Sequence, residues 1–387
     1  MGEDYFDNSA TTRVDPLVVE AMVPFFSDFY GNVSSIHSIG REVRPYEEKA
    51  RKSVAKLINA DPEEIIFTAS GSESDNLAII STARAFKHKG KHLITSCIEH
   101  KAVLETFRFL EQEEGFEVTY LPVDKQGVID MEFYKNALRD DTILVSVMLA
   151  NNEIGTIEPI KEIAALASKK GAIVHTDAVQ AVGKMNIDVN ELGIHLLTFS
   201  GHKIYAPKGI GVLYVDIELR EQLKPIIHGG QQEGGLRAGT ENIPYIIGLG
   251  KACEILLEKQ DSEILHIKRL RDTFEKRGLE EIPDTYVNGA IDNRVPSISD
   301  IAFRYIEGEA LMVYAREVCC SAGSACTSAS TNPSHVLSAI NIDEVDIHGA
   351  LRFSFGRFNT LDEVNRAVDV LKESVEKLRK MSPLYNK

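Results

Sequence analysis

The chain reads Phe199-Ser-Gly-His-Lys-Ile-Tyr-Ala-Pro-Lys-Gly-Ile-Gly211 between two mostly apolar runs, residues 195–199 and 210–215. Each run is typical of a buried strand. Lys203 therefore lies in a loop between buried strands, and no carboxylate stands beside it in the sequence. Because burial disfavours the ammonium form of a lysine, Lys203 is a candidate for imine chemistry. A solvated loop lysine is the competing interpretation.

Strand and helix patterns alternate through the first half of the chain. Runs of β-branched and apolar residues predict strands at 64–68, 92–96, 116–121, 142–149, 172–176 and 196–199. Helical periodicity predicts helices at 73–88, 101–114, 130–139 and 160–170, and an earlier helix that opens at Asp15-Pro16 and ends before Gly31. Such alternation indicates βαβ units, and it predicts an α/β fold with a mainly parallel sheet covered on both faces.

The pattern changes after a long helical stretch at 243–277. A strand is expected at 298–305, then helices at 308–317 and 334–340, a strand at 350–355 and a last helix at 361–381. A chain of 387 residues usually exceeds what one hydrophobic core supports. We therefore predict two domains, a large one of residues 13–260 and a smaller one of residues 1–12 and 261–387.

Composition and charge exclude several classes of protein. The formal net charge is −15 at pH 7, whereas a nucleic-acid or anionic-membrane partner favours a basic face. No apolar run is long enough to span a bilayer. The acidic start, Met1-Gly-Glu-Asp-Tyr-Phe6, has neither the apolar core of a signal peptide nor the Ser or Thr of a myristoylation signal. We therefore expect a cytoplasmic protein with no direct nucleic-acid partner and no membrane attachment.

Three stretches carry polar residues near predicted strand ends, where α/β proteins bind ligands. Thr68-Ala-Ser-Gly-Ser-Glu-Ser-Asp-Asn76 joins a strand to a helix, so its small residues and free backbone N–H groups suit a phosphate. Asp177 follows the strand 172–176, and a buried carboxylate there needs a cationic partner such as a protonated ring nitrogen. His100 stands between a strand and a helix, where it could stack on an aromatic ring or relay protons. Each stretch also has a simpler interpretation as a helix cap.

Two residues of the carboxyl-terminal part stand out. Cys326 lies in Ser321-Ala-Gly-Ser-Ala-Cys-Thr-Ser-Ala-Ser330, and these small side chains predict a mobile loop at about 321–331. A cysteine there suits transfer chemistry better than core packing. Arg352 alternates with apolar residues in Leu351-Arg-Phe-Ser-Phe355, so it is either a buried fork for a carboxylate or an edge-strand arginine that faces water. Five cysteines without CxxC spacing argue against a disulfide framework or a structural zinc site.

Six motifs, in their order along the chain, resemble those of the cysteine desulfurases of the NifS/IscS type, pyridoxal-phosphate enzymes of the aminotransferase class V family. They are Glu73-Ser-Asp-Asn76, Glu99-His-Lys101, Asn151-Asn-Glu-Ile-Gly155, Ser200-Gly-His-Lys203, Arg237-Ala-Gly-Thr240 and Gly323-Ser-Ala-Cys-Thr-Ser328. The similarity extends from Asp7-Asn-Ser-Ala-Thr-Thr12 to Ser382-Pro-Leu384. It implies the fold-type I transferase fold, with a large domain around a mainly parallel seven-stranded sheet and a smaller α+β carboxyl-terminal domain.

The resemblance also implies how the cofactor, pyridoxal 5'-phosphate, is held. Lys203 forms a Schiff base with it, and Asp177 pairs with the pyridinium nitrogen. Gln180 contacts the phenolic oxygen, while His100 stacks on the ring and assists proton transfer. The remaining cofactor contacts are Gly71, Ser72, Asn152, Ser200, His202 and, from the partner subunit of a homodimer, Thr240.

The reaction that the resemblance implies is the conversion of L-cysteine to L-alanine. The substrate carboxylate binds at Asn152 and Arg352, with Asn32 as a further substrate contact. Lys203 removes the Cα proton, and Cys326 takes the sulfur as a persulfide. An acceptor for iron–sulfur cluster assembly, such as a scaffold protein, or for tRNA thiolation then receives it. No resident metal is implied, although Cys326 could transiently ligate a nascent iron–sulfur cluster.

Other functions make different demands on these residues. Another class V activity, an aminotransferase or a lyase acting on a selenium substrate, would share Lys203 and Asp177 but would not need Cys326. A binding or scaffold protein with a relic pocket would be expected to lose some of the residues Lys203, His100, Asp177 and Cys326. A nicotinamide-dependent dehydrogenase would need G-x-G-x-x-G after the first strand, and the chain has none there.

Overall fold

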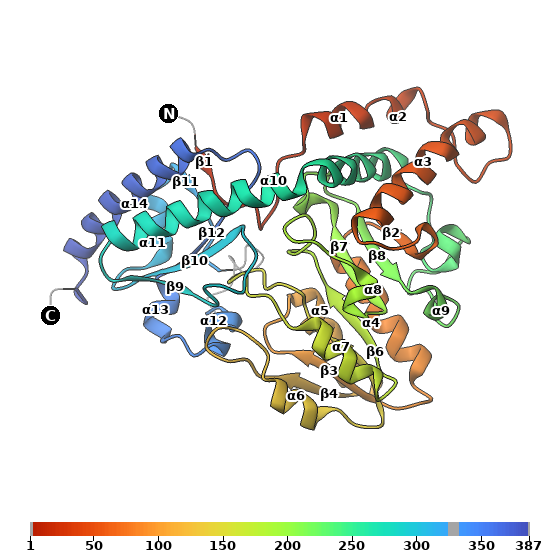
Figure 1. Ribbon diagram of the computed structural model, residues 1–387, viewed down its shortest axis with the longest axis horizontal. Helices are drawn as coiled ribbons and strands as arrows, with labels where there is room; N and C mark the ends of the chain where they lie inside the picture. Colours follow the sequence, from red (N-terminus) through yellow and green to blue (C-terminus); the bar gives the residue numbers. More distant parts are fainter. Residues whose placement is uncertain (1–2, 324–332, 386–387) are drawn as a thin grey trace.

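The computed structural model describes residues 3–323 and 333–385 of the chain. Its largest element is a seven-stranded sheet (Figure 1) made of β2 (Ile65–Thr68), β3 (His92–Ser96), β4 (Glu117–Leu121), β5 (Thr142–Ser146), β6 (Ile173–Asp177), β7 (Leu196–Ser200) and β8 (Gly211–Val215). The strand order is β2-β8-β7-β6-β5-β3-β4. Neighbouring strands from β7 to β4 are parallel, whereas β8 is antiparallel to β7 and to β2. The predicted mainly parallel sheet is confirmed.

Helices cover both faces of this sheet because successive strand residues point to opposite sides. Leu196 belongs to the core beneath α4 (Gly71–Phe86) and α5 (Lys101–Glu114). Its neighbour Leu197 belongs to the core shared with α3 (Ser38–Leu57), α7 (Ile160–Ser168) and α10 (Ile243–Glu281). The remaining elements of this part are α1 (Pro16–Met22), α2 (Pro24–Ser27), α6 (Met131–Ala137), α8 (Val189–Leu192), α9 (Ile217–Arg220) and the 3₁₀ turns η1 (Pro62–Glu64), η2 (Gly201–Lys203) and η3 (Gln232–Gly235).

A smaller, three-stranded sheet lies toward the other end of the long helix α10 (Figure 1). It pairs β12 (Ala350–Ser354), β10 (Ile298–Phe303) and β9 (Thr285–Asn288) in that order, all antiparallel. A second pair joins β1 (Asp4–Tyr5) to β11 (Val318–Cys319) in parallel. The helices here are α11 (Gly308–Tyr314), α12 (His335–Ala339), α13 (Glu344–His348) and α14 (Leu361–Met381). Aromatic side chains such as Phe6, Phe274 and Phe353 fill a separate core in this part.

Three local predictions differ from the structure. The helix expected from Pro16 toward Gly31 is two helices, because Pro24 has no N–H to continue the first one. The strand expected at 142–149 ends at Ser146. The four residues of β9 were not predicted at all, since three of them are only partly buried and carry no clear alternation.

The predicted boundary near residue 260 falls inside α10, which continues to Glu281. We keep the division into residues 13–260 and residues 1–12 with 261–387 as a proposal. The amino-terminal arm supports it, because β1 pairs with β11 and Phe6 packs in the smaller core. Within the described residues, no helix is both long and apolar enough to cross a membrane.

Candidate active site

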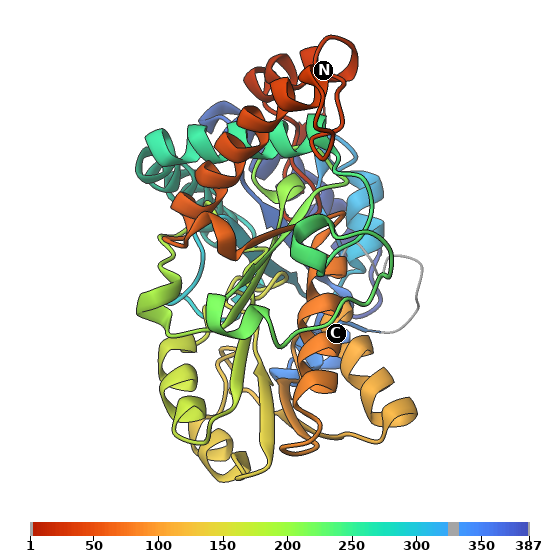
Figure 2. The same ribbon diagram turned by 90° about the vertical axis from the view of Figure 1, so that its right-hand side faces the viewer.

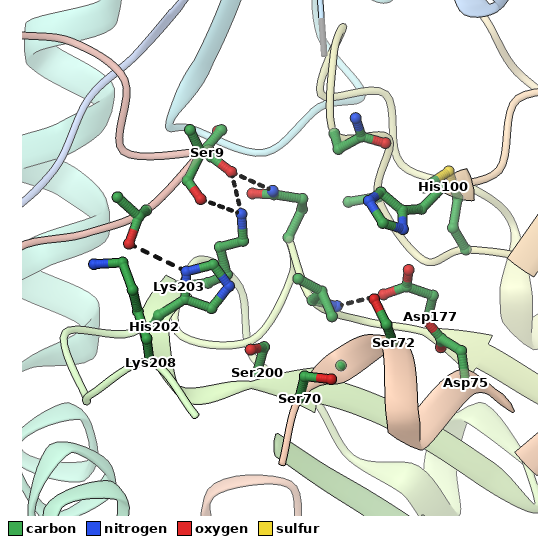
Figure 3. A pocket seen from close by; sticks show the side chains of 18 of the residues that line it. Ser9, Ser70, Ser72, Asp75, His100, Asp177, Ser200, His202, Lys203 and Lys208 are labelled. Atoms are coloured by element: carbon green, nitrogen blue, oxygen red, sulfur yellow. Dashed lines mark hydrogen bonds between the residues drawn. The ribbon is translucent and has the colours of Figure 1, made fainter. Parts of the chain in front are cut away.

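A cavity of about 530 Å³ lies where the carboxyl ends of β6 and β7 meet the N-terminus of α4 (Figure 3). Open α/β sheets commonly bind ligands at such a position. Most residues that the sequence nominated line this cavity: Gly71, Ser72, His100, Asn152, Asp177, Gln180, Ser200, His202, Lys203 and Arg352. The other lining residues are Ser9, Ala10, Thr11, Ser70, Asp75, Met148, Ala150, Val179, Lys208 and Gly209.

Lys203 reaches the cavity from η2, the single turn that follows β7. Its Nζ donates to the backbone carbonyl of Ser9 and, over 2.8 Å, to that of Ala10. The Ser9 carbonyl also accepts a hydrogen bond of 3.0 Å from Gln180 Nε2. The amino-terminal arm thus covers the lysine and leaves it half-buried, so Lys203 is not the solvated loop lysine of the competing interpretation.

Asp177 and His100 lie close together on one side of the cavity (Figure 3). Asp177 is buried at the end of β6, and its carboxylate accepts a hydrogen bond of 2.8 Å from Val179 N–H. Burial raises the pKa of Asp177, while His100 and Lys203 act in the opposite direction. His100 is the N-cap of α5, and its Nδ1 accepts from Ala102 N–H over 3.1 Å. His100 is therefore a capping residue and a cavity residue at the same time.

Asp75 is a site residue that the sequence reasoning missed. It is 1% exposed, and its Oδ1 has no hydrogen-bond partner among the described residues. One ligand-type atom each from Asp75, His100 and Asp177 lies within 4.8 Å of the others. Burial and the charge of Asp177 raise the pKa of Asp75 well above its usual range. The sequence did carry a signal for Asp75. This residue stands close to Leu77 and Ala78 on the side of α4 that faces the sheet, and an aspartate is unexpected on a helix face that packs into a core.

Below Asp75 lies a second buried polar group, His175. The distance from its Nε2 to Asp75 Oδ1 is 3.7 Å, and its Nδ1 lies 2.8 Å from Ser146 Oγ. Burial lowers the pKa of His175 to about 3, so its ring is neutral at physiological pH. The floor of the cavity therefore gains no positive charge from this histidine.

The N-terminus of α4 forms the anion-binding end of the cavity. Ser70 caps the helix, since its Oγ accepts from Glu73 N–H over 3.1 Å. The first N–H groups of a helix have no intrahelical partner, and the helix dipole favours an anion beside them. Gly71 allows the close approach here, because a Cβ would lie 3.1 Å from Val179 Cγ2 and 3.4 Å from Ser200 Cβ.

His202 lies beside this end of the cavity. Its Nδ1 is 3.1 Å from Thr11 Oγ1, a contact that again involves the amino-terminal arm. Burial lowers the pKa of His202 to about 3, and the nearby lysines Lys203, Lys208 and Lys184 act in the same direction. His202 is therefore a neutral hydrogen-bonding group, and the positive charge here comes from lysines and the helix N-terminus.

Arg352 reaches the cavity from β12 of the smaller sheet. It is 2% exposed, so the interpretation as an edge-strand arginine that faces water is wrong. One terminal nitrogen donates to the Asn152 carbonyl over 2.8 Å, and the other to Asp7 Oδ1 over 3.0 Å. Its Nε is buried without a partner among the described residues. A guanidinium with an unused donor suits the carboxylate of a substrate.

Two nominated residues, Thr240 and Asn32, do not line the cavity of their own chain, and a third lies outside the described residues. Thr240 is exposed and lines a smaller hollow of about 210 Å³ near Arg237. Asn32 is exposed, and its Oδ1 accepts from Ser34 N–H over 2.8 Å. Cys326 lies outside the described residues. The roles assigned to these residues stay predictions.

Comparisons with known proteins agree with this geometry. The aminotransferase class-V family model matches residues 4–367. A cysteine desulfurase IscS of Dictyoglomus turgidum is 50% identical over 383 residues, which cover 98% of this chain and 96% of that protein. The chain belongs to the cysteine desulfurases of the aminotransferase class-V family.

Comparison with solved structures leads to the same family for this desulfurase. A NifS-like protein has a TM-score of 0.90 and 37% sequence identity, over 97% of this chain and all of its own. A structure described as SspA in complex with cysteine has a TM-score of 0.80 and 37% identity, over 92% of this chain and all of its own. The fold is therefore that of fold-type I pyridoxal-phosphate enzymes, as predicted.

Pyridoxal 5'-phosphate is the cofactor of this desulfurase family, and the cavity residues fit it. The α4 N-terminus with Gly71 suits the phosphate, and Asp177 is the buried carboxylate that a protonated ring nitrogen would neutralise. The amine of Lys203 lies in the same cavity. Gln180 Oε1 is buried there without a partner among the described residues, which leaves it available to a ligand.

Proposed function

We propose that this desulfurase converts L-cysteine to L-alanine with Lys203 as the proton carrier and Cys326 as the sulfur acceptor. The observation that supports the first role is the convergence of Lys203, His100 and Asp177 on one cavity beside a helix N-terminus. The second role rests on the resemblance of the cysteine motif, because Cys326 lies outside the described residues. Among solved relatives, the structure described with bound cysteine supports the substrate.

In this proposal the chain holds the cofactor at three points. Lys203 binds it through its amine, Asp177 keeps its ring nitrogen protonated, and the N-terminus of α4 takes its phosphate together with Ser200 and His202. His100 covers the ring and Gln180 contacts its phenolic oxygen. When bound, pyridoxal phosphate supplies an electron sink for the substrate carbon that loses a proton.

The remaining residues bind the substrate and move a proton and a sulfur atom. Arg352 and Asn152 hold the carboxylate of L-cysteine, and Lys203 Nζ takes the Cα proton. The Cys326 thiolate then attacks the substrate sulfur, so that an S–S bond forms while the C–S bond breaks. The electron pair of the broken C–S bond stays on Cβ, which takes up a proton to become the methyl group of alanine, and Lys203 returns a proton to Cα.

We also propose a homodimer in which Thr240 completes the phosphate site of the partner. Support comes from exposed apolar side chains in the amino-terminal region, Phe26 at 60%, Tyr30 at 67% and Ile36 at 86%. Figure 2 shows this region, drawn in red, at one end of the molecule. Thr240 is itself exposed, as such a role requires. The acceptor, an iron–sulfur scaffold protein or another sulfur acceptor, and the cytoplasmic location stay predictions.

Incubation of the holoenzyme with L-cysteine tests the proposed function. The expected products are alanine and a persulfide, which mass spectrometry maps to Cys326. Cys326→Ala should keep the cofactor absorbance but form no persulfide at this position and release alanine at least about 100-fold more slowly, since the nucleophile is gone. Lys203→Ala should lose both covalent cofactor attachment and alanine formation.

The control is Cys97→Ala, which removes a half-buried thiol whose pKa is raised by burial. This variant should behave as wild type. Undiminished sulfur release from cysteine by Cys326→Ala would contradict the assigned carrier, and alanine formation by Lys203→Ala at the wild-type rate would contradict the assigned base.

A further inference from the structure

The segment that carries Cys326 has two described ends, one up to Gly323 and one from Pro333 onward. Both ends are hydrogen-bonded to residues that line the cavity or stand next to its lining residues in the sequence. The amino-terminal end pairs with β12: Ser321 N–H donates to the Arg352 carbonyl over 3.2 Å, and Arg352 N–H donates to the Ser321 carbonyl over 2.8 Å. Arg352 lines the cavity. This end of the segment therefore starts from the backbone of a proposed substrate-binding residue.

The carboxyl-terminal end is fixed by two side chains. Ser334 Oγ donates to Glu153 Oε2 over 2.5 Å, and it also caps α12 by accepting from Leu337 N–H over 3.1 Å. His335 Nε2 lies 3.1 Å from the backbone carbonyl of Glu99. Glu153 and Glu99 are the direct sequence neighbours of the cavity residues Asn152 and His100.

The carboxylate of Glu153, which bonds to Ser334, also lies near the other described end of the segment. Gly323 has a φ of +67°, and a Cβ on it would lie 3.6 Å from Glu153 Oε2 and 3.8 Å from Ser334 Cβ. Glu153 is 1% exposed, so this oxygen accepts the Ser334 hydrogen bond in a place that water hardly reaches. A hydrogen bond from a hydroxyl to a buried carboxylate is stronger than a neutral one.

Apolar packing supports the same arrangement. Val336 and Leu337 of α12 belong to one small core with Ile98 and Ile154. Ile154 follows Glu153 in sequence, and Glu153 N–H donates to Asn151 Oδ1 over 2.8 Å. The backbone on both sides of Glu153 is thus held in place, and Ile154 packs with the residues of α12.

We propose that Glu153 is a positioning residue for sulfur transfer, because its hydrogen bond to Ser334 holds one described end of the Cys326 segment and its carboxylate lies near Gly323 at the other end. The inference rests on the proposed role of Cys326 as sulfur acceptor. Glu153 itself is not a lining residue of the cavity. Its loss should therefore affect the transfer of sulfur more than the binding of cofactor or cysteine.

The test compares Glu153→Gln, Ser334→Ala and the double variant as holoenzymes. Single-turnover formation of the Cys326 persulfide should slow about tenfold in each, since Glu153→Gln removes the charge that strengthens this hydrogen bond and Ser334→Ala removes its donor. The double variant should be no slower than the slower single variant, because both changes act on one hydrogen bond. The KM for cysteine and the change in cofactor absorbance on cysteine addition should stay within about twofold of wild type.

Two further variants separate positioning from general damage. Ser334→Thr keeps the hydroxyl and should restore the persulfide rate. Glu158→Gln is the control, because Glu158 is also a buried carboxylate and lies shortly after Glu153 in the sequence. It is 3% exposed and accepts from Ile129 N–H over 3.0 Å, but it is hydrogen-bonded to neither described end. This variant should leave the persulfide rate unchanged.

A wild-type persulfide rate in Glu153→Gln or in Ser334→Ala would overturn the inference. So would a loss in both variants that appears equally in KM or in the cofactor spectrum, because Glu153 would then act through the cavity. Should Glu153→Gln fail to fold, the Ser334 variants decide alone, since Ser334 is only half-buried. If wild type itself places no persulfide on Cys326, the proposed function fails, which is a different outcome.

Discussion

Asp75 and Asp177 bring two buried carboxyl groups to the floor of one cavity. His100 and Lys203 lower the pKa of Asp177 against the effect of burial, whereas the charge of Asp177 raises the pKa of Asp75 further. Two close carboxyls do not both ionise readily, so one of them keeps a proton. We assign that proton to Asp75, which leaves Asp177 as the anion in its proposed role beside the cofactor ring.

Asp75→Asn and Asp177→Asn should therefore differ in effect. Asp75→Asn replaces a neutral carboxyl by a neutral amide of similar shape, so kcat should stay within about threefold of wild type, a change below 1 kcal/mol. Asp177→Asn removes a charge and should lower kcat by about tenfold or more. Steady-state alanine formation by the two holoenzymes measures this difference. Equal losses in both variants would contradict the assignment of the proton.

The same assignment has a consequence for stability. The folded chain keeps the Asp75 proton, while the unfolded chain releases it above about pH 4. The wild-type free energy of unfolding should therefore fall as the pH rises above that value, and Asp75→Asn should lack this part of the fall. In thermal unfolding experiments, the melting temperature of Asp75→Asn should rise relative to that of wild type between about pH 5 and pH 8.

Single residues also show what a sequence can and cannot reveal about a site. Lys203, Asp177 and His100 could be nominated because each stands at a predicted strand end in a recognisable motif. The contacts of Lys203 and Gln180 with Ser9 could not, because these partners lie more than 170 positions away in the sequence and meet only through the fold. Asp75 was missed because its burial depends on which face of α4 contacts the sheet.

Among the elements, α10 decides how closely the amino-terminal helices pack on the molecule. Gly250 of α10 lies against α3, where a Cβ would be 2.5 Å from Ala50 Cβ and 2.6 Å from Ala50 Cα. Gly278 is in the same helix, but a Cβ there meets no atom within 4 Å. The two glycines thus form a matched pair, one of which is needed for packing.

Gly250→Ala should lower the free energy of unfolding by about 1–3 kcal/mol, because α3 and α10 have to move apart. Gly278→Ala should instead raise it by up to about 1 kcal/mol, since alanine favours a helix and no neighbour is displaced. Urea unfolding followed by circular dichroism measures both changes. A stabilised Gly250→Ala variant would mean that the helix contact is looser than its geometry indicates.

Element boundaries were predictable where a cap marks them. The range 101–114 is found as predicted because His100 caps α5 at its start and Gly115, with φ +69°, ends it. The range 361–381 is found as predicted because Thr360 and Glu363 form a capping box. No such signal marks β9. The break between α1 and α2 does carry one, Pro24, which the sequence reasoning passed over.

At the scale of the whole molecule, the alternation of strands and helices was enough to predict a mainly parallel sheet and a site at its strand ends. Both predictions follow from how parallel strands are connected. The crossover connections place helices on the faces of the sheet and leave the carboxyl ends of the strands open to a ligand. The antiparallel position of β8 was not predictable in this way, because β8 follows β7 after a short loop without a helix of ordinary length. The assembly of subunits is likewise absent from the pattern of one chain.

The proposed homodimer can be tested by mixing two defective subunits, one with Lys203→Ala and one with Thr240→Val. Thr240→Val removes a hydroxyl at nearly constant shape and should weaken cofactor binding about tenfold in its own homodimer, the effect of one hydrogen bond to an anion. Co-expression with two different affinity tags isolates the mixed dimer. Cofactor titration and alanine formation are then measured on it.

If Thr240 serves the partner's site, the mixed dimer has one complete site, with Lys203 from the Thr240→Val subunit and Thr240 from the other. Cofactor affinity at that site should return to the wild-type value, and alanine formation should be about half that of wild type per dimer. If Thr240 instead served its own subunit, no complete site would form, and the weak binding of the Thr240→Val homodimer would persist. The exposed position of Thr240, apart from the cavity of its own chain, favours the first result.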